Sequence, residues 1–173
     1  MCRMLVTYKS RTGATMYYAR IIAGKLGADS REWEDGMDLS GYDLVIYGGG
    51  VYAGTVNGLY EARKEIRRQN VENFVIFATG GTPESISDTI ELVWEKNLRG
   101  DDYSFPHFYM QSGLLYSALP FGTRMRMKIC AKVMKSQMRD ENGIPFRMDK
   151  SYSIAGPEHA EGLIGYVRSH WAS

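Results

Sequence analysis

The chain has few of the residue types that mark secreted, metal-binding or membrane-spanning proteins. Of its 173 residues only two are cysteine, Cys2 and Cys130, and three are histidine. Two isolated cysteines form no disulfide framework and no metal-ligand motif, which is typical of reduced thiols in a cytoplasmic protein. No apolar run approaches the roughly 18 residues of a membrane span. Because Met1-Cys2-Arg3 also lacks the apolar stretch of a signal peptide, we expect a cytoplasmic protein.

The chain also lacks an excess of charge of either sign: 21 Lys and Arg residues face 20 Asp and Glu residues, and the net charge is +1. A chain this close to neutral has no general attraction to nucleic acid. The three histidines, His107, His159 and His170, lie outside the glycine-rich segments described below, so we predict no acid–base catalyst and no metal site. The length and the 44% hydrophobic content predict one soluble domain over residues 1–173 with a core of its own.

The most informative stretch that is present is residues 5–15, Leu-Val-Thr-Tyr-Lys-Ser-Arg-Thr-Gly-Ala-Thr. An apolar run over 4–8 predicts a buried strand, and Ala14, Tyr17, Ile21 and Ile22 repeat at helical spacing directly behind it. Hydroxyl side chains fill the turn between them, beside the free N–H groups and the positive dipole end of the helix. Such a turn can hold a phosphate, although Ser and Thr are also ordinary helix-capping residues.

Strands and helices alternate along the rest of the chain. Helices are predicted at 13–25, from 57 to 69, from Thr82 (N-cap) and Pro83 onward, and from Pro157 to the end. Buried strands are predicted at 4–8, 42–47, 74–78 and 105–111, with a weak edge strand within 28–38. This alternation predicts an α/β fold with a doubly wound, mostly parallel sheet that places ligands beyond the carboxyl ends of its strands.

Two further glycine-rich loops are predicted at that edge of the sheet, 48–54 and 79–83. Together with residues 9–15 they would let the backbone approach a flat, phosphorylated ligand closely. Tyr52 is the aromatic residue of the second loop, and both a stacking role and an ordinary exposed position are open for it. Thr55 stands where a nucleotide-hydrolysing P-loop needs lysine, and no Gly-x-Gly-x-x-Gly follows the first strand. These absences disfavour NTP and dinucleotide sites.

An insertion of about 114–151 interrupts the alternation before the last helix. Its segment 121–139 carries six basic residues and no acidic one, interleaved with methionines. This pattern predicts a basic amphipathic helix. It could border a substrate or contact an anionic membrane surface. A solvated face whose methionines pack on the sheet is the other interpretation.

The turn Ser10-x-Thr12-Gly13-x-Thr15 resembles the phosphate loop of flavodoxins, in which the pattern Ser/Thr-x-Thr-Gly-x-Thr holds FMN. The resemblance implies a five-stranded parallel sheet of order 2-1-3-4-5 over nearly the whole chain, with non-covalent FMN as cofactor. It implies that the phosphate is wrapped by Ser10, Arg11, Thr12, Gly13, Ala14 and Thr15. It implies that the isoalloxazine is flanked by Gly50, Val51, Tyr52, Thr79, Gly80 and Gly81.

A narrower resemblance concerns the insertion. Gly113-Leu114-Leu115-Tyr116 followed by a basic, methionine-rich segment is similar to the flavodoxin-like, menaquinone-dependent protoporphyrinogen dehydrogenases. The loop after the third strand departs from that group, because Tyr52-Ala53 stands where Arg-Tyr is expected. This departure weakens the prediction of the substrate more than the prediction of FMN as cofactor.

Three functions follow as hypotheses. The first is an electron carrier that serves a redox partner protein or a small-molecule acceptor through FMN, although the chain lacks the acidic field of typical flavodoxin carriers. The second is a flavin oxidoreductase that acts on a quinone or porphyrinogen-like substrate, with peripheral membrane contact through 121–139. The third is an interaction module that has lost FMN, which the intact hydroxyl turn disfavours.

Overall fold

The computed structural model describes residues 2–114, 121–122, 124–125, 128 and 151–171. Five parallel strands form its central sheet in the spatial order β2-β1-β3-β5-β6. In sequence order these are β1 (Met4–Lys9), β2 (Asp29–Glu32), β3 (Leu44–Tyr52), β5 (Phe74–Gly80) and β6 (His107–Gln111). The short strand β4 (Thr55–Val56) pairs antiparallel with the end of β3 and lies off this path. The predicted order 2-1-3-4-5 is therefore confirmed for the parallel strands.

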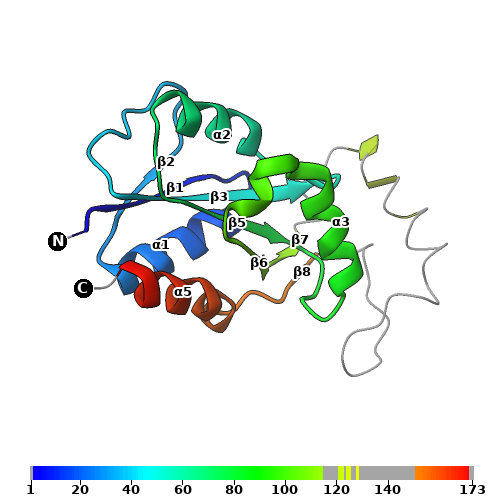
Figure 1. The fold of residues 1–173 in the computed structure, drawn as a ribbon. Coiled ribbons are helices and arrows are strands. Elements are labelled where there is room, and N and C mark those ends of the chain that lie inside the picture. The colour runs from blue at the N-terminus through cyan, green and yellow to red at the C-terminus, as the bar shows by residue number, and fades with distance from the viewer. Residues whose placement is uncertain (1, 115–120, 123, 126–127, 129–150, 172–173) are drawn as a thin grey trace.

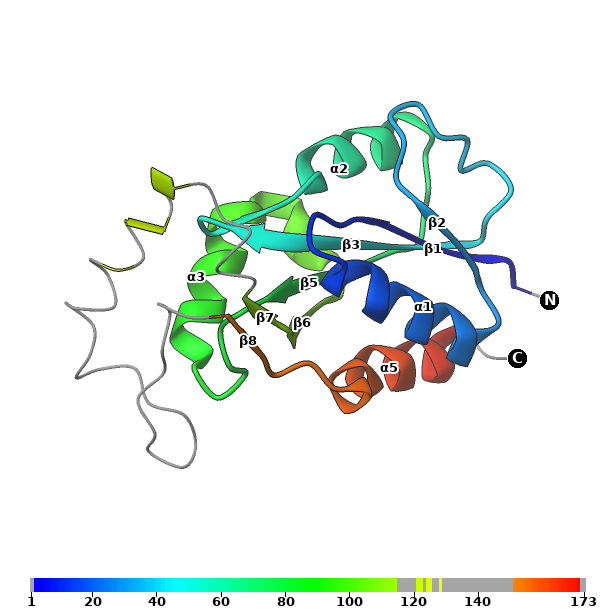
Figure 2. The same ribbon diagram turned by 180° about the vertical axis from the view of Figure 1, so that it is seen from behind.

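Two helices cover each face of the sheet (Figures 1 and 2). The helices α1 (Ala14–Leu26) and α5 (Glu161–Trp171) lie on one face, with the 3₁₀ turn η3 (Pro157–Ala160) leading into α5. The helices α2 (Leu59–Arg68) and α3 (Ser87–Asn97) lie on the other, and the 3₁₀ turn η1 (Gly100–Ser104) follows α3. The central strands are consequently buried on both sides, as parallel sheets require.

The buried side chains form one cluster on each face. Val6, Ile46 and Phe77 meet α1 and α5 on one side, whereas Leu5 and Ile76 meet α2 and α3 on the other. This alternation follows from the period of two along a strand. It explains why the central strands read as continuous apolar runs in the sequence.

Of the residues predicted to repeat along the first helix, Ile22 is buried and Ile21 packs against the core, but Tyr17 does not face inward. Tyr17 is 42% exposed, while the buried residues of α1 are Thr15, Tyr18, Ala19, Ile22 and Ala23. Tyr18 is fully buried because its hydroxyl has partners in the interior: it donates to the carbonyl of Gln111 at 2.5 Å and accepts from the Gly156 N–H at 3.2 Å. A tyrosine can be buried when its polar end is satisfied in this way.

The predicted glycine loop at 48–54 is mostly strand. Gly48, Gly49 and Gly50 lie within β3: all three pair with β5, and Gly48 and Gly49 also pair with β1. A side chain at Gly48 would overlap the ring of Phe77, so the position of that ring leaves room only for glycine there. The loop itself is Ala53–Gly54, both with positive φ, which is the backbone of a tight hairpin turn. Likewise Thr79 and Gly80 belong to β5 and not to a loop.

The helix predicted to open at Thr82 and Pro83 begins later, at Ser87. Thr82 is not an N-cap, because its N–H donates to the Tyr109 hydroxyl at 3.1 Å and its carbonyl accepts from the same hydroxyl at 2.9 Å. The carbonyl of Pro83 accepts from the N–H of Ile86 in a separate turn. The contact with Tyr109 therefore outweighs the preference of Thr82 for an N-cap position.

The insertion begins and ends in a small hairpin. Strand β7 (Gly113–Leu114) pairs antiparallel with β8 (Tyr152–Ser153), at the end of the sheet where the strands finish (Figure 2). Residues 121, 122, 124, 125 and 128 are helical, and the rest of the predicted basic helix at 121–139 lies outside the described residues. Within the described part of the chain, no helix has the length and apolar character needed to cross a bilayer.

Candidate functional site

The twelve predicted cofactor residues come together at the carboxyl ends of β1, β3 and β5. Lys9, the last residue of β1, is in register with Gly49, and Gly50 is in register with Thr79. The turn 10–15 continues from β1, and Gly81 directly follows β5. Because the crossover after β1 and the crossover after β3 run to opposite sides of the sheet, this edge is a topological switch point, where ligands of such folds bind.

The turn 10–15 is arranged to receive an anion. Gly13 is the N-cap of α1, has φ +90° and leaves open space where a Cβ would stand. No side chain caps the helix and no acidic residue lies in its first turn, so its positive dipole end is uncompensated. The hydroxyl of Ser10 accepts from the Gly13 N–H at 3.1 Å and keeps its own O–H to donate. Thr12 is exposed beside it.

Thr15 joins this turn to β5. Its Oγ1 lies 2.8 Å from Oγ1 of Thr79, and the two residues are only 2% and 3% exposed. One hydroxyl donates to the other, which leaves the accepting hydroxyl with a proton for another partner. If Thr79 donates, the Thr15 O–H is the group left facing the turn. The bond thus connects the turn 10–15 with β5, whose end forms another part of the candidate site.

Tyr52 closes the site on the β3 side and packs against Arg11. The Arg11 guanidinium lies 4.6 Å from the centre of the Tyr52 ring, and the same ring covers Gly50, where a Cβ would come within 2.9 Å of it. Arg11 therefore adds positive charge to the site and an aromatic contact. The Val51 side chain packs against the core and its backbone pairs with Val56, so it offers little to a ligand.

Two tyrosines that the sequence did not single out support the β5 side. The Tyr109 hydroxyl bonds with the backbone of Thr82, and the Tyr152 hydroxyl donates to the carbonyl of Gly81 at 2.5 Å. Burial raises the pKa of both tyrosines well above the ordinary value, so both are neutral donors at physiological pH. Spacing could not reveal them, since Tyr152 lies 71 residues from its partner.

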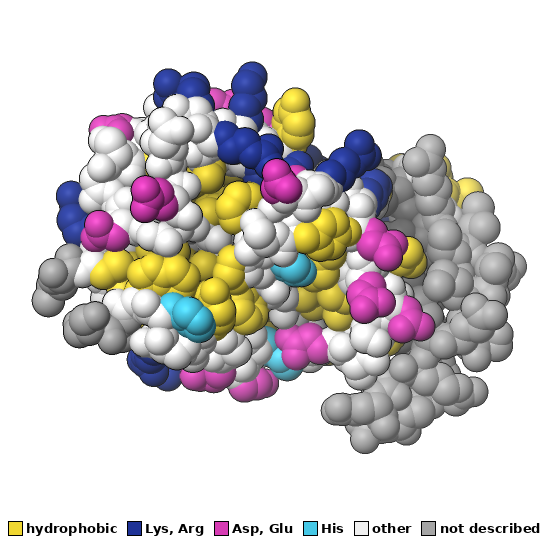
Figure 3. Space-filling model, viewed as in Figure 1, with side chains coloured by type: hydrophobic (Ala, Val, Ile, Leu, Met, Phe, Trp, Pro, Cys, Tyr) yellow, Lys and Arg dark blue, Asp and Glu magenta, His cyan; other side chains and the backbone are white. Residues whose placement is uncertain are grey.

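A cavity of about 450 Å³ adjoins the turn 10–15. It lies between the start of α1 and the hairpin β7–β8, and its walls are Thr12, Gly13, Ala14, Tyr17, Ser112, Gly113, Leu114, Tyr152, Ser153 and Ala155. A larger cavity of about 580 Å³ lies beside β4, between α2 and the end of α3, and has lysines and arginines in its walls. Figure 3 shows Lys and Arg side chains on the side of the molecule where α2 lies. This larger cavity contains none of the twelve predicted residues. The cavity of about 450 Å³ is therefore the one that adjoins the candidate site.

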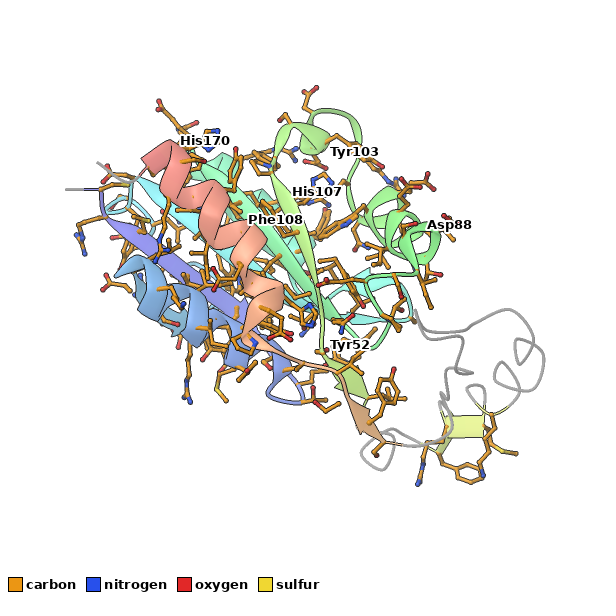
Figure 4. All side chains as sticks on the ribbon, turned by 90° about the horizontal axis from the view of Figure 1, so that it is seen from below. Tyr52, Asp88, Tyr103, His107, Phe108 and His170 are labelled. Atoms are coloured by element: carbon orange, nitrogen blue, oxygen red, sulfur yellow. The ribbon has the colours of Figure 1, made fainter. Side chains whose placement is uncertain are left out.

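The described residues contain no group of three or more His, Cys, Asp or Glu side chains that could hold a metal ion. Figure 4 shows His107 and His170 well away from Tyr52. The third histidine, His159, has its Nδ1 3.1 Å from a carboxylate oxygen of Glu84. The arrangement suits the holding of a phosphorylated, planar molecule more than acid–base chemistry.

The fold and this edge define the chain as a doubly wound α/β protein with a hydroxyl-bearing turn at its switch point. A sequence model of the flavodoxin domain matches residues 5–141, which is most of the chain. The protein therefore belongs to the flavodoxin domain family. The fold class predicted from the sequence is confirmed by this membership and by the strand order.

Solved structures similar to the chain include several flavoproteins. A flavodoxin, WrbA-like protein from Agrobacterium tumefaciens is 16% identical, with 63% of this chain and 83% of that chain covered and a TM-score of 0.41. A flavoprotein in complex with FMN from Lactobacillus acidophilus is 13% identical, with 64% and 93% covered and a TM-score of 0.42. Flavodoxin 2 from Bacillus cereus is 18% identical, with 63% and 84% covered and a TM-score of 0.39. A comparison with curated proteins found no match.

Proposed function

We propose that the protein binds FMN non-covalently and passes electrons through it to a redox partner protein or a small-molecule acceptor. The observation that carries the proposal is the turn 10–15, which presents hydroxyls, uncapped helix N–H groups and Arg11 with no acidic residue in the first helical turn. Membership in the flavodoxin domain family supports the same cofactor.

The residues of the site divide into those that hold the phosphate and those that face the ring. Ser10, Thr12 and the first N–H groups of α1 donate to the phosphate oxygens, and Gly13 lets them approach. Tyr52 and the backbone of Gly80 and Gly81 border the ring from the ends of β3 and β5. When bound, FMN supplies the redox chemistry, while the protein binds the cofactor and shields it from water.

The test is FMN titration of the purified protein, followed by dialysis and measurement of visible absorbance. We expect one FMN per chain. We expect Gly13→Asp to raise the Kd by about fivefold or more, because a carboxylate near a phosphate dianion costs at least about 1 kcal/mol even at the surface. Thr12→Ala removes one donor and should weaken binding by a smaller factor.

A matched control is available on the same helix. Gly24 is exposed near the other end of α1, with nothing within 4 Å of its Cβ position, so Gly24→Asp adds the same charge away from the turn. It should leave the FMN Kd unchanged. A Kd that ignores both Gly13→Asp and Thr12→Ala would end the proposal that the turn binds phosphate.

The second candidate is a flavin oxidoreductase acting on a quinone or porphyrinogen-like molecule. The cavity of about 450 Å³ favours it, since Tyr17, Leu114 and Tyr152 offer apolar walls beside the turn. Turnover assays with a quinone and a porphyrinogen separate the two candidates, because a carrier reduces one-electron partners and ignores both molecules. Retention on anionic liposomes, lost in Arg124→Ala/Arg126→Ala/Lys128→Ala, tests the proposed membrane contact through 121–139.

A further inference from the structure

The peptide unit between Gly81 and Thr82 is held at both of its polar ends by tyrosine hydroxyls. Its carbonyl, that of Gly81, accepts from the Tyr152 hydroxyl at 2.5 Å. Its N–H, that of Thr82, donates to the Tyr109 hydroxyl at 3.1 Å. The same Tyr109 hydroxyl donates to the Thr82 carbonyl at 2.9 Å. Rotation of this peptide would break both end contacts at once, so its orientation is fixed.

The two rings also press directly against the glycines of the segment. A Cβ on Gly80 would lie 2.5 Å from the Tyr109 hydroxyl, and a Cβ on Gly81 would lie 2.5 Å from the Tyr152 hydroxyl. Glycine is therefore required at both positions if the two tyrosines are to reach the backbone. This close approach is a property of the pair of elements β6 and β8, which supply the tyrosines from opposite ends of the insertion.

The preceding peptide, between Gly80 and Gly81, is oriented as well. Its carbonyl accepts from the N–H of Ser112 at 2.8 Å and from the Ser112 hydroxyl at 3.1 Å, on the β6 side. The structure has no cis peptide bond among its described residues, so the Gly81 N–H points away from β6 and toward β3. The parallel pairing of β3 with β5 ends at Gly50 and Thr79, and the carbonyl of Gly50 accepts from the N–H of Asn57, so it is not an acceptor for Gly81. Among the described residues no partner is found for the Gly81 N–H.

We propose that Tyr109 and Tyr152 are positioning residues that act together with Ser112: Ser112 holds the peptide before Gly81, the two tyrosines hold the peptide after it, and the Gly81 N–H is thereby kept as a donor of fixed direction at the wall of the FMN site. This inference rests on the proposed function. A donor held in place before the ligand arrives need not be ordered on binding. A donor that faces the ring also binds the oxidised and reduced cofactor to different extents, and so contributes to the midpoint potential.

The insertion gains a structural role from this arrangement. The hairpin β7–β8 carries Tyr152 back to the cofactor segment, although 38 positions separate Leu114 from Tyr152. Figure 4 shows this hairpin at the same end of the sheet as Tyr52. A change in this strand pairing would also change the support of Gly81, because Tyr152 lies in β8.

The experiment uses Tyr109→Phe, Tyr152→Phe and the double variant of the full chain, because phenylalanine keeps the ring and removes the hydroxyl. Tyr60→Phe is the matched control, since Tyr60 is 69% exposed and far from this segment in the chain. Three quantities are measured: the FMN Kd, the midpoint potential of the bound flavin, and the amide exchange rate of Thr82 without FMN. Thermal unfolding confirms that each variant is folded.

We expect each single variant to raise the FMN Kd by about three- to tenfold, the range that a lost hydrogen bond gives. We expect Thr82 to exchange at least about tenfold faster in Tyr109→Phe, because its N–H loses its acceptor. We expect a shifted midpoint potential, with about 30 mV for each tenfold change in the ratio of the Kd values for oxidised and reduced FMN. In the double variant the effects should be less than additive, since both hydroxyls fix one peptide.

Two different failures can be told apart. A wild-type protein that binds no FMN contradicts the proposed function. A wild-type protein that binds FMN, with Tyr109→Phe and Tyr152→Phe that keep the same Kd, potential and exchange rate, overturns the positioning role alone. A Kd change with an unaltered midpoint potential also overturns it, because it would show support for the fold without control of a donor to the ring.

Discussion

The hydroxyl of Thr15, in the first turn of α1, lies 2.8 Å from the hydroxyl of Thr79 in β5. The two residues are 64 positions apart and almost completely buried. The bond fixes the turn 10–15 to the strand that ends at Gly80, just before Gly81. It therefore sets the distance between the two parts of the site that would hold the ends of one cofactor.

Removing one member of this pair should destabilise the protein more than removing both. Thr15→Val leaves the Thr79 hydroxyl buried without a partner, at a cost of about 1–3 kcal/mol in the free energy of unfolding. In Thr15→Val/Thr79→Val both hydroxyls are replaced by methyl groups, and the cost should fall toward zero. Urea unfolding of the two single variants and the double variant measures the coupling. Strictly additive losses would contradict the bond's contribution.

Arg11 should contribute to FMN affinity through its charge. Arg11→Gln should raise the Kd by about three- to tenfold at low salt, and by less at about 1 M salt, because exposed charges are screened. Arg20→Gln is the control, since Arg20 is also exposed on α1 but lies outside the turn. Equal effects of the two variants would show that only the overall charge matters. Titrations at two salt concentrations make the comparison.

Gly48 and Gly24 should respond to alanine in opposite directions. In Gly48→Ala the new methyl group would overlap the Phe77 ring inside the sheet, with a loss of about 1–3 kcal/mol. In Gly24→Ala nothing lies within 4 Å of the new methyl group on an exposed helical position, with a gain of about 0.5–1 kcal/mol. Chemical denaturation measures both. An unaltered stability in Gly48→Ala would mean that Phe77 can move aside.

Stability should fall above about pH 10, the ordinary pKa of tyrosine. Burial is the main cause that raises the pKa of Tyr18 to about 12, and burial also raises the pKa values of Tyr47, Tyr109 and Tyr152. The unfolded chain then releases protons that the folded chain retains. The stabilisation is complete below about pH 10 and is lost as the pH rises through the folded-state values.

Each tyrosine that stays protonated only in the folded chain lowers the free energy of unfolding by at most about 1.4 kcal/mol per pH unit. Urea unfolding between pH 8 and pH 11 measures the slope, and Tyr18→Phe should make it shallower. Tyr60→Phe, at an exposed position, should leave it unchanged. A slope that is the same in all three proteins would show that Tyr18 does not ionise differently in the two states.

The elements of this fold were predictable wherever the signal is local. The apolar run before the turn 10–15 and the helices predicted from 57 to 69 and from Pro157 onward could be read from local signals. The last of these opens with the 3₁₀ turn η3 at Pro157 and continues as α5 from Glu161. The prediction failed where tertiary contacts override spacing. Thr82 has the residue type of an N-cap but bonds to Tyr109, and Gly48–Gly50 have the composition of a loop but lie in β3.

The sequence by itself determined the family and the hydroxyl-rich composition of the turn 10–15, because both can be read from residues close together in the chain. The strand order followed only through the family resemblance, and the structure has that order. Only the tertiary structure decided how the turn is joined to the rest of the site. Thr15 meets Thr79, Arg11 meets Tyr52, and Tyr152 meets Gly81 through the packing of separate strands and helices. Contacts between residues this far apart leave no periodic signal, since they arise only when the sheet brings the strand ends together.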